Sequence, residues 1–209
     1  MGAAINWLTG NLLEIFGTIT GILYVFLEIK QDARLWPVGI VTSAIYVWVF
    51  FVNKLYADAG LQCYYLVVSV LGWYWWTNLA HRKANVKAKK EPLRVTHVDK
   101  KTAFYLGAIF LGSYLAVWQL LDRATDSPVP AADAFITTLS AVATWMLARK
   151  IFEHWYLWIV VNFTAMVLFF SRGLYPTIIL YAVYFVMSFV GLKEWKKTIT
   201  YDKKEDRNG

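Results

Sequence analysis

The stretch HWYLWIVVN, from His154 to Asn162, carries the residues whose types and spacing could do chemistry. On a helix, the side chains of Trp155, Trp158 and Asn162 fall on one face, because they follow one another after three and four residues. An indole face attracts a desolvated organic cation, and an amide both donates and accepts hydrogen bonds. This face could therefore bind a flat, positively charged ring that carries polar substituents.

The composition indicates that this face lies inside a membrane. Of the 209 residues, 58% are hydrophobic and 18% aromatic, whereas roughly 45–50% apolar residues are usual in soluble domains. The charged residues collect between long apolar stretches, as in polytopic helical membrane proteins. The single cysteine, Cys63, excludes an intrachain disulfide and a thiolate metal site, and no metal or cofactor is expected. No cleavable signal peptide is expected at the N-terminus.

Seven apolar segments predict an all-α integral membrane protein with seven transmembrane helices. Most segments are at or just below the ~20 residues that cross ~30 Å of hydrocarbon, and several end in aromatic residues, as interfacial belts require. The expected spans are Leu12–Ile29, Leu35–Val52, Gly60–Trp76, Ala103–Leu121, Ala131–Ala148, Trp155–Phe170 and Leu174–Leu192.

Lysine and arginine are distributed unequally between the two sides of these spans. The side that holds the N-terminus carries 3 of them, and the side that holds the C-terminus carries 18. The positive-inside rule therefore predicts an outside N-terminus and a cytoplasmic C-terminus. The basic segments between the third and fourth spans and after the seventh are expected near anionic lipid, which argues against a nucleic-acid partner.

The sequence repeats itself after a shift of 119 residues. This shift places Trp36 on Trp155 and Trp76 on Trp195, with 13 identities in the 41 positions from Trp36 to Trp76. Three spans reverse the direction of the chain, and a fourth restores it, so the halves are expected to be parallel three-helix repeats joined by a linker helix. The expected organisation is 1–78, first repeat; 79–102, basic loop; 103–121, linker helix; 131–195, second repeat; and 196–209, basic tail.

Parallel repeats in a small membrane protein favour a transporter with its site between the halves. The halves differ where Trp158 and Asn162 align with Gly39 and Ser43, as expected around an asymmetric ligand. An interfacial anchor remains an alternative role for Trp155, and a scaffold role for the matching pair Tyr65 and Tyr184. The candidate binding residues are Trp155, Trp158, Asn162, Gln62, Tyr65, Thr177, Tyr181, Tyr184, Ser43 and Tyr46.

Several kinds of chemistry are not expected. Glu14 and Glu28 stand at span ends, where they are predicted to reach water, and no buried acid–histidine relay for proton coupling can be drawn. The three histidines lie in or beside loops without metal spacing. No P-loop, GxSxG or HExxH motif is present, so an ATP-driven pump is excluded for this chain and an enzyme is not expected. A receptor that binds without transport remains open.

The segments LYVFLEIKQ, WPVGIVTS and YYLVVSVLGWYWW, together with Trp155-x-x-Trp158-x-x-x-Asn162, resemble the PnuC-type vitamin transporters. The resemblance covers about 13–195 and implies a SWEET-like 3+1+3 fold, a bacterial inner-membrane location and assembly as a homotrimer. It implies facilitated diffusion of nicotinamide riboside, trapped by cytoplasmic phosphorylation, with the tryptophans and asparagine as substrate contacts. Thiamine, another flat aromatic cation, stays open as the substrate, with riboflavin third.

Overall fold

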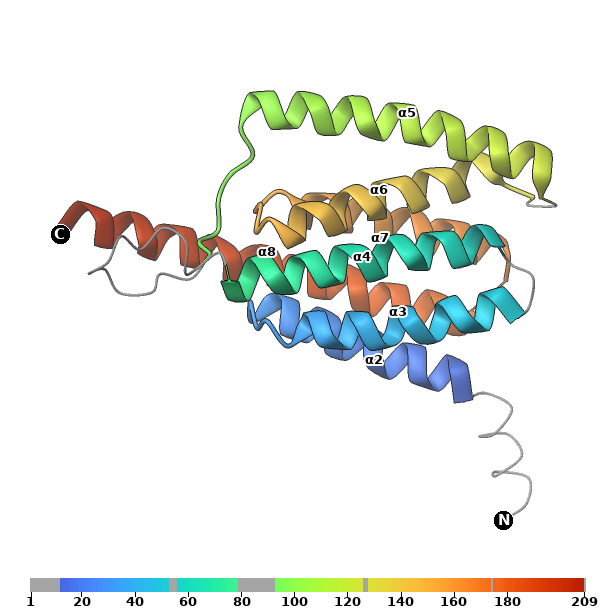
Figure 1. Cartoon of the computed structure of the whole chain (residues 1–209), viewed down its shortest axis with the longest axis horizontal. Helices are drawn as coiled ribbons and strands as arrows, with labels where there is room; N and C mark the ends of the chain where they lie inside the picture. The colour runs from blue at the N-terminus through green and yellow to red at the C-terminus, as the bar shows by residue number, and fades with distance from the viewer. Residues whose placement is uncertain (1–11, 53–55, 79–92, 126–127, 174, 209) are drawn as a thin grey trace, which may run out of the picture.

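The computed structural model describes residues 12–52, 56–78, 93–125, 128–173 and 175–208. These residues form seven helices, shown in Figure 1, which confirms the all-helical expectation. The first eleven residues and most of the expected basic loop, 79–92, lie outside the described residues, as does the side chain of Glu14. The helices are α2 (Leu12–Ile29), α3 (Leu35–Val52), α4 (Tyr56–Asn78), α5 (Lys100–Ala124), α6 (Pro130–Ala148), α7 (His154–Ser171) and α8 (Tyr175–Asn208).

The helix ends agree with the expected spans at both ends of α2 and α3 and at the end of α6, and they differ elsewhere. Asp99 accepts a hydrogen bond from the backbone N–H of Thr102 at 3.0 Å and so begins α5 at Lys100, ahead of the expected Ala103. The last helix continues beyond the expected span to Asn208, so residues 196–208 of the expected tail are helical. Apolar runs locate the part of a helix in hydrocarbon, whereas caps decide where the helix itself begins and ends.

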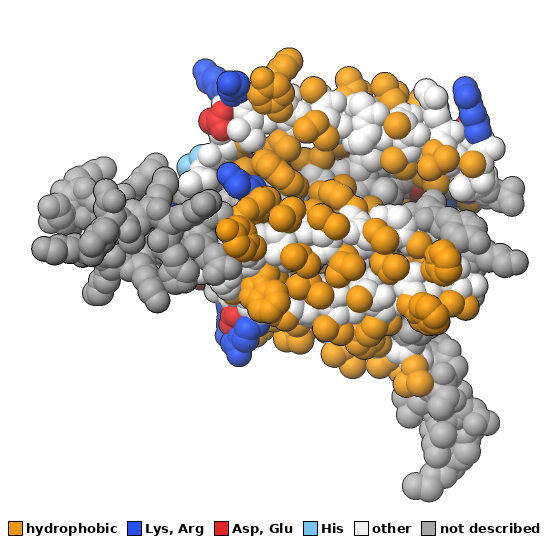
Figure 2. All heavy atoms as spheres, in the orientation of Figure 1, with side chains coloured by type: hydrophobic (Ala, Val, Ile, Leu, Met, Phe, Trp, Pro, Cys, Tyr) orange, Lys and Arg blue, Asp and Glu red, His pale blue; other side chains and the backbone are white. Residues whose placement is uncertain are grey.

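Five of the described helices are long and apolar enough to cross a membrane, namely α3, α5, α6, α7 and the Thr177–Thr200 part of α8. Helix α2 holds a shorter apolar stretch, Ile15–Ile29. The outward faces carry large apolar side chains such as Trp48, Phe104 and Phe170, each more than two-thirds exposed, and Figure 2 shows such side chains along the bundle with most lysines and arginines near its ends. That surface suits lipid, where exposed apolar side chains need no protein partner.

The helix contacts occur in matching pairs at the 119-residue spacing. Helix α3 packs on α4 as α7 packs on α8, and α2 packs on α3 as α6 packs on α7. Contacts between the two groups also match, because α2 lies against α8 and α4 lies against α6. Helix α5 packs on α6 at the edge of the bundle and contains no buried residue (Figure 1).

Four buried tryptophans form the core at one end of the bundle. The rings of Trp36 and Trp76 meet edge to face with centroids 5.4 Å apart, and those of Trp155 and Trp195 do the same at 5.8 Å. The two pairs are 119 residues apart. Each pair also anchors a neighbouring helix, since Trp76 Nε1 donates to the carbonyl oxygen of Ala148 at 3.1 Å and Trp195 Nε1 donates to that of Glu28 at 3.0 Å. This cluster ties α4 to α6 and α8 to α2.

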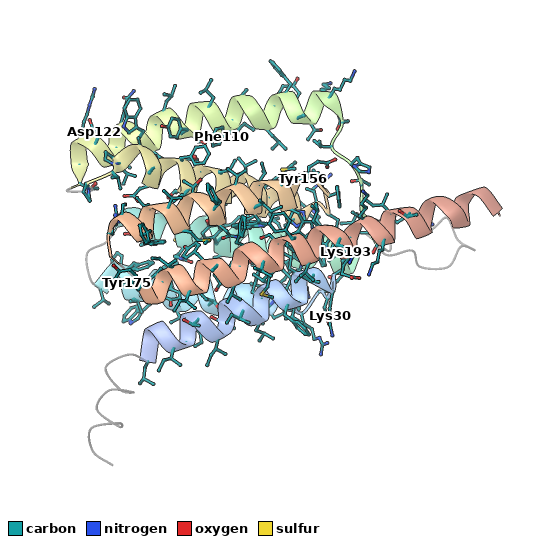
Figure 3. All side chains as sticks on the ribbon, turned by 180° about the vertical axis from the view of Figure 1, so that it is seen from behind. Lys30, Phe110, Asp122, Tyr156, Tyr175 and Lys193 are labelled. Carbon is teal, nitrogen blue, oxygen red and sulfur yellow. The ribbon has the colours of Figure 1, made fainter. Side chains whose placement is uncertain are left out.

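The same end of the bundle carries two matching helix caps. Gln31 and Lys150 follow α2 and α6 with φ of 53° and 52°, the left-handed conformation in which a helix often stops. Lys150 Nζ donates to Gln31 Oε1 at 3.4 Å. In the turn after Gln31, the Arg34 guanidinium lowers the pKa of the Asp32 carboxyl through hydrogen bonds. Figure 3 shows that Lys30 and Lys193 also lie at this end, whereas Asp122 and Tyr175 lie at the other.

The ring of Trp155 packs so closely on Gly191 that only glycine fits at this position. The ring of Trp36 restricts Gly72 in the same way. A Cβ atom on Gly191 would overlap the six-membered part of the Trp155 indole, whereas a Cβ on Gly112 in α5 would meet nothing within 4 Å. We therefore expect Gly191→Ala to destabilise the protein by about 1–3 kcal/mol, the usual cost of overpacking a core.

The measurement is thermal unfolding of the detergent-solubilised protein. Gly112→Ala is the matched control, since alanine favours a helix over glycine by up to ~1 kcal/mol and should leave stability equal or higher. Equal melting temperatures of the two variants would contradict the close packing of Trp155 on Gly191.

Candidate functional site

A cavity of about 390 Å³ lies between the helices, and its lining comes from α2, α3, α4, α6, α7 and α8. Most of the lining consists of residue pairs that are 119 positions apart, so the two repeats face each other across the space. The nine pairs are Gly17 and Ile136, Gly21 and Ser140, Val25 and Thr144, Gly39 and Trp158, Thr42 and Val161, Ser43 and Asn162, Gln62 and Tyr181, Tyr65 and Tyr184, and Ser69 and Ser188.

Four lining residues lack a counterpart in the lining: Thr20, Tyr24, Glu28 and Trp155. Three of them follow one another along one face of α2, at intervals of four residues. The two repeats therefore differ most in the part of the wall formed by the C-terminal half of α2, next to the tryptophan cluster.

The structure brings most of the expected binding residues to this cavity. Trp155, Trp158 and Asn162 line it from α7, and Ser43 lines it from α3. Two candidates are absent from the lining: Tyr46 lies against Gly17, which itself lines the cavity, and Thr177 stands half-buried near the start of α8. Each lies one helical turn from a lining residue of its own helix, Tyr46 after Ser43 and Thr177 before Tyr181. The remaining candidates in the lining are Gln62, Tyr65, Tyr181 and Tyr184.

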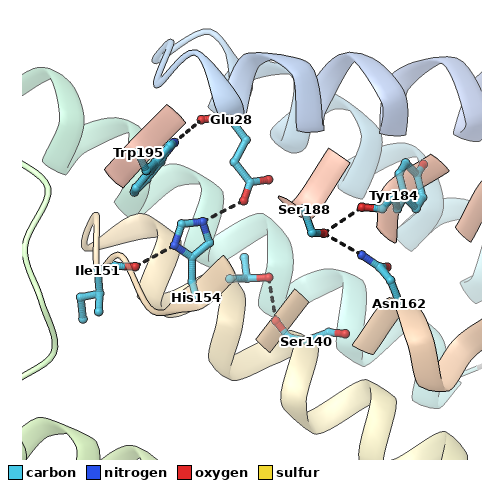
Figure 4. A network of polar contacts seen from close by, with 9 residues as sticks. Glu28, Ser140, Ile151, His154, Asn162, Tyr184, Ser188 and Trp195 are labelled. Carbon is cyan, nitrogen blue, oxygen red and sulfur yellow. Dashed lines mark hydrogen bonds and ion pairs between the residues drawn. The ribbon is translucent and has the colours of Figure 1, made fainter. Parts of the chain in front are cut away.

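Asn162 is held by a short chain of hydrogen bonds (Figure 4). The hydroxyl of Ser188 donates its only hydrogen to the carbonyl oxygen of Tyr184 at 2.8 Å. Its oxygen therefore accepts from Asn162 Nδ2, 3.1 Å away. This orientation fixes the amide and leaves its carbonyl oxygen as an acceptor next to the cavity.

Two of the described indole N–H groups in the lining lack a hydrogen-bond partner. Nε1 of Trp155 and of Trp158 are buried donors without an acceptor, and the buried hydroxyl of Thr42 is unpaired as well. A buried polar group without a partner costs free energy, about 1–3 kcal/mol. Such donors in a cavity wall indicate a ligand that brings acceptors.

Glu28 and His154 form a buried pair at the asymmetric side of the cavity, which corrects the expectation that Glu28 reaches water and that no acid–histidine relay exists. Glu28 is 2% exposed and His154 fully buried. Nε2 of His154 lies 3.1 Å from Oε1 of Glu28, and Nδ1 lies 2.7 Å from the carbonyl oxygen of Ile151 (Figure 4). The carbonyl only accepts, so Nδ1 donates and Nε2 is the atom that faces the carboxyl group.

The pair could not be found from one span at a time, because its members are 126 positions apart and each stands at a helix end, where charged groups usually meet water. The repeat did contain a signal. At the 119-residue shift, Glu28 aligns with Leu147 and His154 with Leu35, and both leucines are fully buried. A glutamate and a histidine that align with two core leucines of the other repeat are expected to be buried as well.

The charge of the lining limits what the cavity can bind. Glu28 is the one carboxylic acid among the described lining residues, and none of these residues is Lys, Arg or His. Among the described residues, no group of three or more His, Cys, Asp and Glu side chains could hold a metal ion. A cavity with one carboxyl group and several indole and phenol rings suits an aromatic cation better than a phosphate, which prefers Arg or Lys.

Comparison with known proteins gives a consistent result. A family model described as "Nicotinamide mononucleotide transporter" matches residues 11–197. The chain is 24% identical over 201 residues to the nicotinamide riboside transporter PnuC of Escherichia coli, covering 88% of this chain and 84% of that protein. It is 22% identical over 200 residues to the riboflavin/roseoflavin transporter RibM of Streptomyces davaonensis, covering 91% and 92%.

A solved structure shares the fold. The crystal structure of the vitamin B3 transporter PnuC matches with a TM-score of 0.70 at 20% identity, covering 96% of this chain and 87% of that one. The helices described above therefore follow an arrangement already seen in a transporter structure.

The Glu28–His154 pair leads to a prediction about stability. Removing one member leaves the other buried without its partner, so Glu28→Leu and His154→Leu should each lower the free energy of unfolding by about 3–5 kcal/mol. The double variant restores the leucine pair found at the repeat positions and should recover most of that loss, since apolar replacements of buried ion pairs are often neutral. Chemical denaturation in detergent checks this, and additive losses in the double variant would refute the coupling.

Proposed function

We propose, from the premise that this chain belongs to the nicotinamide mononucleotide transporter family, that it carries nicotinamide riboside across a bacterial inner membrane by facilitated diffusion. Family members are named as transporters, and the chain has the membrane helices and internal cavity that transport requires. The observation that supports this choice of substrate is the cavity lining, in which indole rings, a fixed amide and a carboxyl group surround one space.

Each part of nicotinamide riboside meets a suitable group in this proposal. Trp158 offers an indole face to the pyridinium ring, an attraction of roughly 2 kcal/mol or more when desolvated. Trp155, whose ring packs on Gly191, offers its unpartnered Nε1–H group. Asn162 and Gln62 offer amides that donate to and accept from the carboxamide and the ribose. Tyr65, Tyr181, Tyr184 and Ser43 complete the proposed contacts, and the proposal is confined to residues of the lining.

The riboside is favoured over the mononucleotide that gives the family its description. A phosphate group in a low-dielectric site needs cationic partners, and the described lining contains no Lys or Arg. Trapping of the imported riboside by cytoplasmic phosphorylation, which the family resemblance implies, fits a carrier that does not accept the phosphorylated product.

The proposed mechanism uses the internal repeat. We interpret the chain as a 3+1+3 arrangement in which α2–α4 and α6–α8 are parallel repeats, and α5 is the linker. Matching contacts and nine matching lining pairs support this interpretation. Rocking of one three-helix group against the other would open the cavity to each side in turn. A homotrimer, which the resemblance implies, stays a prediction that the mass of the solubilised protein would test.

Thiamine is the second candidate substrate, because a thiazolium ring is also a flat cation that indole rings attract. Riboflavin stands third. The similarity to RibM shows that proteins of this kind differ in the vitamin they carry, but riboflavin is neutral and would gain no cation–π attraction from the indole rings.

Uptake into liposomes tests the function. Purified protein should let labelled nicotinamide riboside equilibrate across the membrane without accumulation beyond the outside concentration. Trp158→Ala should weaken binding by about thirtyfold, the equivalent of about 2 kcal/mol, and Asn162→Ala should abolish measurable flux while the protein still inserts. The matched control is Trp48→Ala, which removes an indole that is 70% exposed on the outer face of α3.

Unchanged flux in both cavity variants would remove the site assignment. Binding without flux would favour a receptor, and a chemically altered product would favour an enzyme.

The topology is tested by labelling single cysteines from outside the cell. The native thiol, Cys63, is exposed and is first replaced by serine. A cysteine introduced beside Gly2 should react with a membrane-impermeant maleimide in intact cells, and one beside Lys203 should react only after permeabilisation. Labelling of the C-terminal position in intact cells would overturn the predicted orientation.

A further inference from the structure

The asymmetric side of the cavity contains a second recognition element that the tryptophans and Asn162 do not explain. Along α2, Tyr24 and Glu28 line the cavity, whereas their repeat counterparts in α6, Ala143 and Leu147, do not. The counterpart pair is fully buried. One repeat therefore closes this part of the bundle with apolar side chains, and the other exposes a phenol and a carboxyl group to the substrate space.

The carboxyl group of Glu28 is held in one orientation. His154 approaches Oε1 at 3.1 Å, and its ring is fixed in turn by the 2.7 Å hydrogen bond from Nδ1 to the carbonyl oxygen of Ile151. Rings of Trp155 and Trp195 pack against the imidazole, each with centroids 4.7 Å away. The backbone of Glu28 is anchored as well, by the hydrogen bond from Trp195 Nε1. A side chain restrained at both ends can serve for selective recognition.

The hydrogen-bonding role of the second oxygen, Oε2, follows from this geometry. One proton lies between Nε2 of His154 and Oε1 of Glu28, either on the nitrogen, as an ion pair, or on the oxygen, as a neutral pair. Oε2 carries no hydrogen in either form, so it can only accept. The described contacts of the carboxyl group use Oε1, and Figure 4 shows the other oxygen on the side of Ser188 and Asn162, without a drawn interaction.

We propose that Glu28, positioned by His154, is a specificity-determining residue that selects cationic heteroaromatic vitamins bearing an exocyclic N–H₂ group. Oε2 accepts a hydrogen bond from that group, while the unpartnered N–H of Trp155 in the same part of the lining offers a donor to a neighbouring acceptor of the substrate. This inference rests on the proposed function and deepens it, since it names the chemical group of the substrate that the cavity recognises.

The same arrangement excludes analogues that carry oxygen in place of the amino group. A carboxylate or a ring carbonyl would direct a lone pair, or a negative charge, at an oxygen that cannot donate. Sites built to hydrogen-bond a particular group reject analogues without it by large factors, because their buried polar groups are left unpaired. Nicotinamide riboside and thiamine both carry an N–H₂ group, so the rule applies to either vitamin.

The test measures selectivity for two matched compound pairs by calorimetry on the purified full-length protein. One pair is nicotinamide riboside and its nicotinic acid counterpart, and the other is thiamine and the analogue with oxygen in place of the exocyclic amino group. Wild-type protein should bind the amino-bearing member of at least one pair about a hundredfold more tightly than its analogue. The double variant Glu28→Leu/His154→Leu removes the acceptor and reproduces the leucine pair of the other repeat, and it should reduce that ratio at least about tenfold.

Two features keep this test decisive. The double variant leaves neither member of the buried pair without its partner, because Leu147 and Leu35 are buried at the equivalent positions of the other repeat. The control, Glu153→Gln, alters a carboxyl group that pairs with His97 at 2.8 Å outside the cavity, and its selectivity should equal that of the wild type.

Each outcome has a separate meaning. Loss of selectivity in the double leucine variant, with the selectivity of Glu153→Gln unchanged, supports the inference. Equal binding of vitamin and analogue by the wild-type protein overturns it even if the variant cannot be purified. Unchanged selectivity in the double leucine variant overturns it as well, and both outcomes leave the proposed transport intact. Binding of none of the four compounds overturns the inference and the proposed substrate together.

Discussion

The seating of two indole rings on two glycines is the constraint on which the rest of the molecule depends. Trp36 lies on Gly72 and Trp155 on Gly191, and each ring occupies space that any larger residue would fill. The partner tryptophans then reach across to the other three-helix group and bond to its backbone at Ala148 and Glu28. One end of the bundle is thereby closed by an aromatic layer, and the cavity begins where that layer stops.

Near-symmetric packing and an asymmetric ligand impose opposite demands on this chain. The closing tryptophans and their glycines stay equivalent in the two repeats because they support the same helix contacts. Divergence concentrates in the cavity wall, where Gly39 aligns with Trp158 and Ser43 aligns with Asn162. The buried Glu28 and His154 extend this divergence into the closing layer itself, at positions where the other repeat keeps Leu147 and Leu35.

The sequence was informative wherever a pattern was local or repeated. Apolar runs located the helices, and the Trp155, Trp158 and Asn162 spacing predicted a shared face that lines the cavity. Depth along the bundle was less predictable: Tyr46 has the right helical phase but lies beside Gly17 rather than in the lining. The pairing of Glu28 with His154 was missed because it depends on how α2 meets the start of α7, a contact that no single span encodes.

The cap residues Gln31 and Lys150 have an evolutionary consequence. They occupy equivalent positions in the two repeats and are hydrogen-bonded to each other. In a homodimer of a single three-helix unit, equivalent positions that touch must be the same residue, so the contact would have to be self-complementary. A glutamine amide can meet its own copy, whereas two ammonium groups repel. Joining the two units in one polypeptide removes that restriction, and a lysine facing a glutamine is a combination open only to the fused chain.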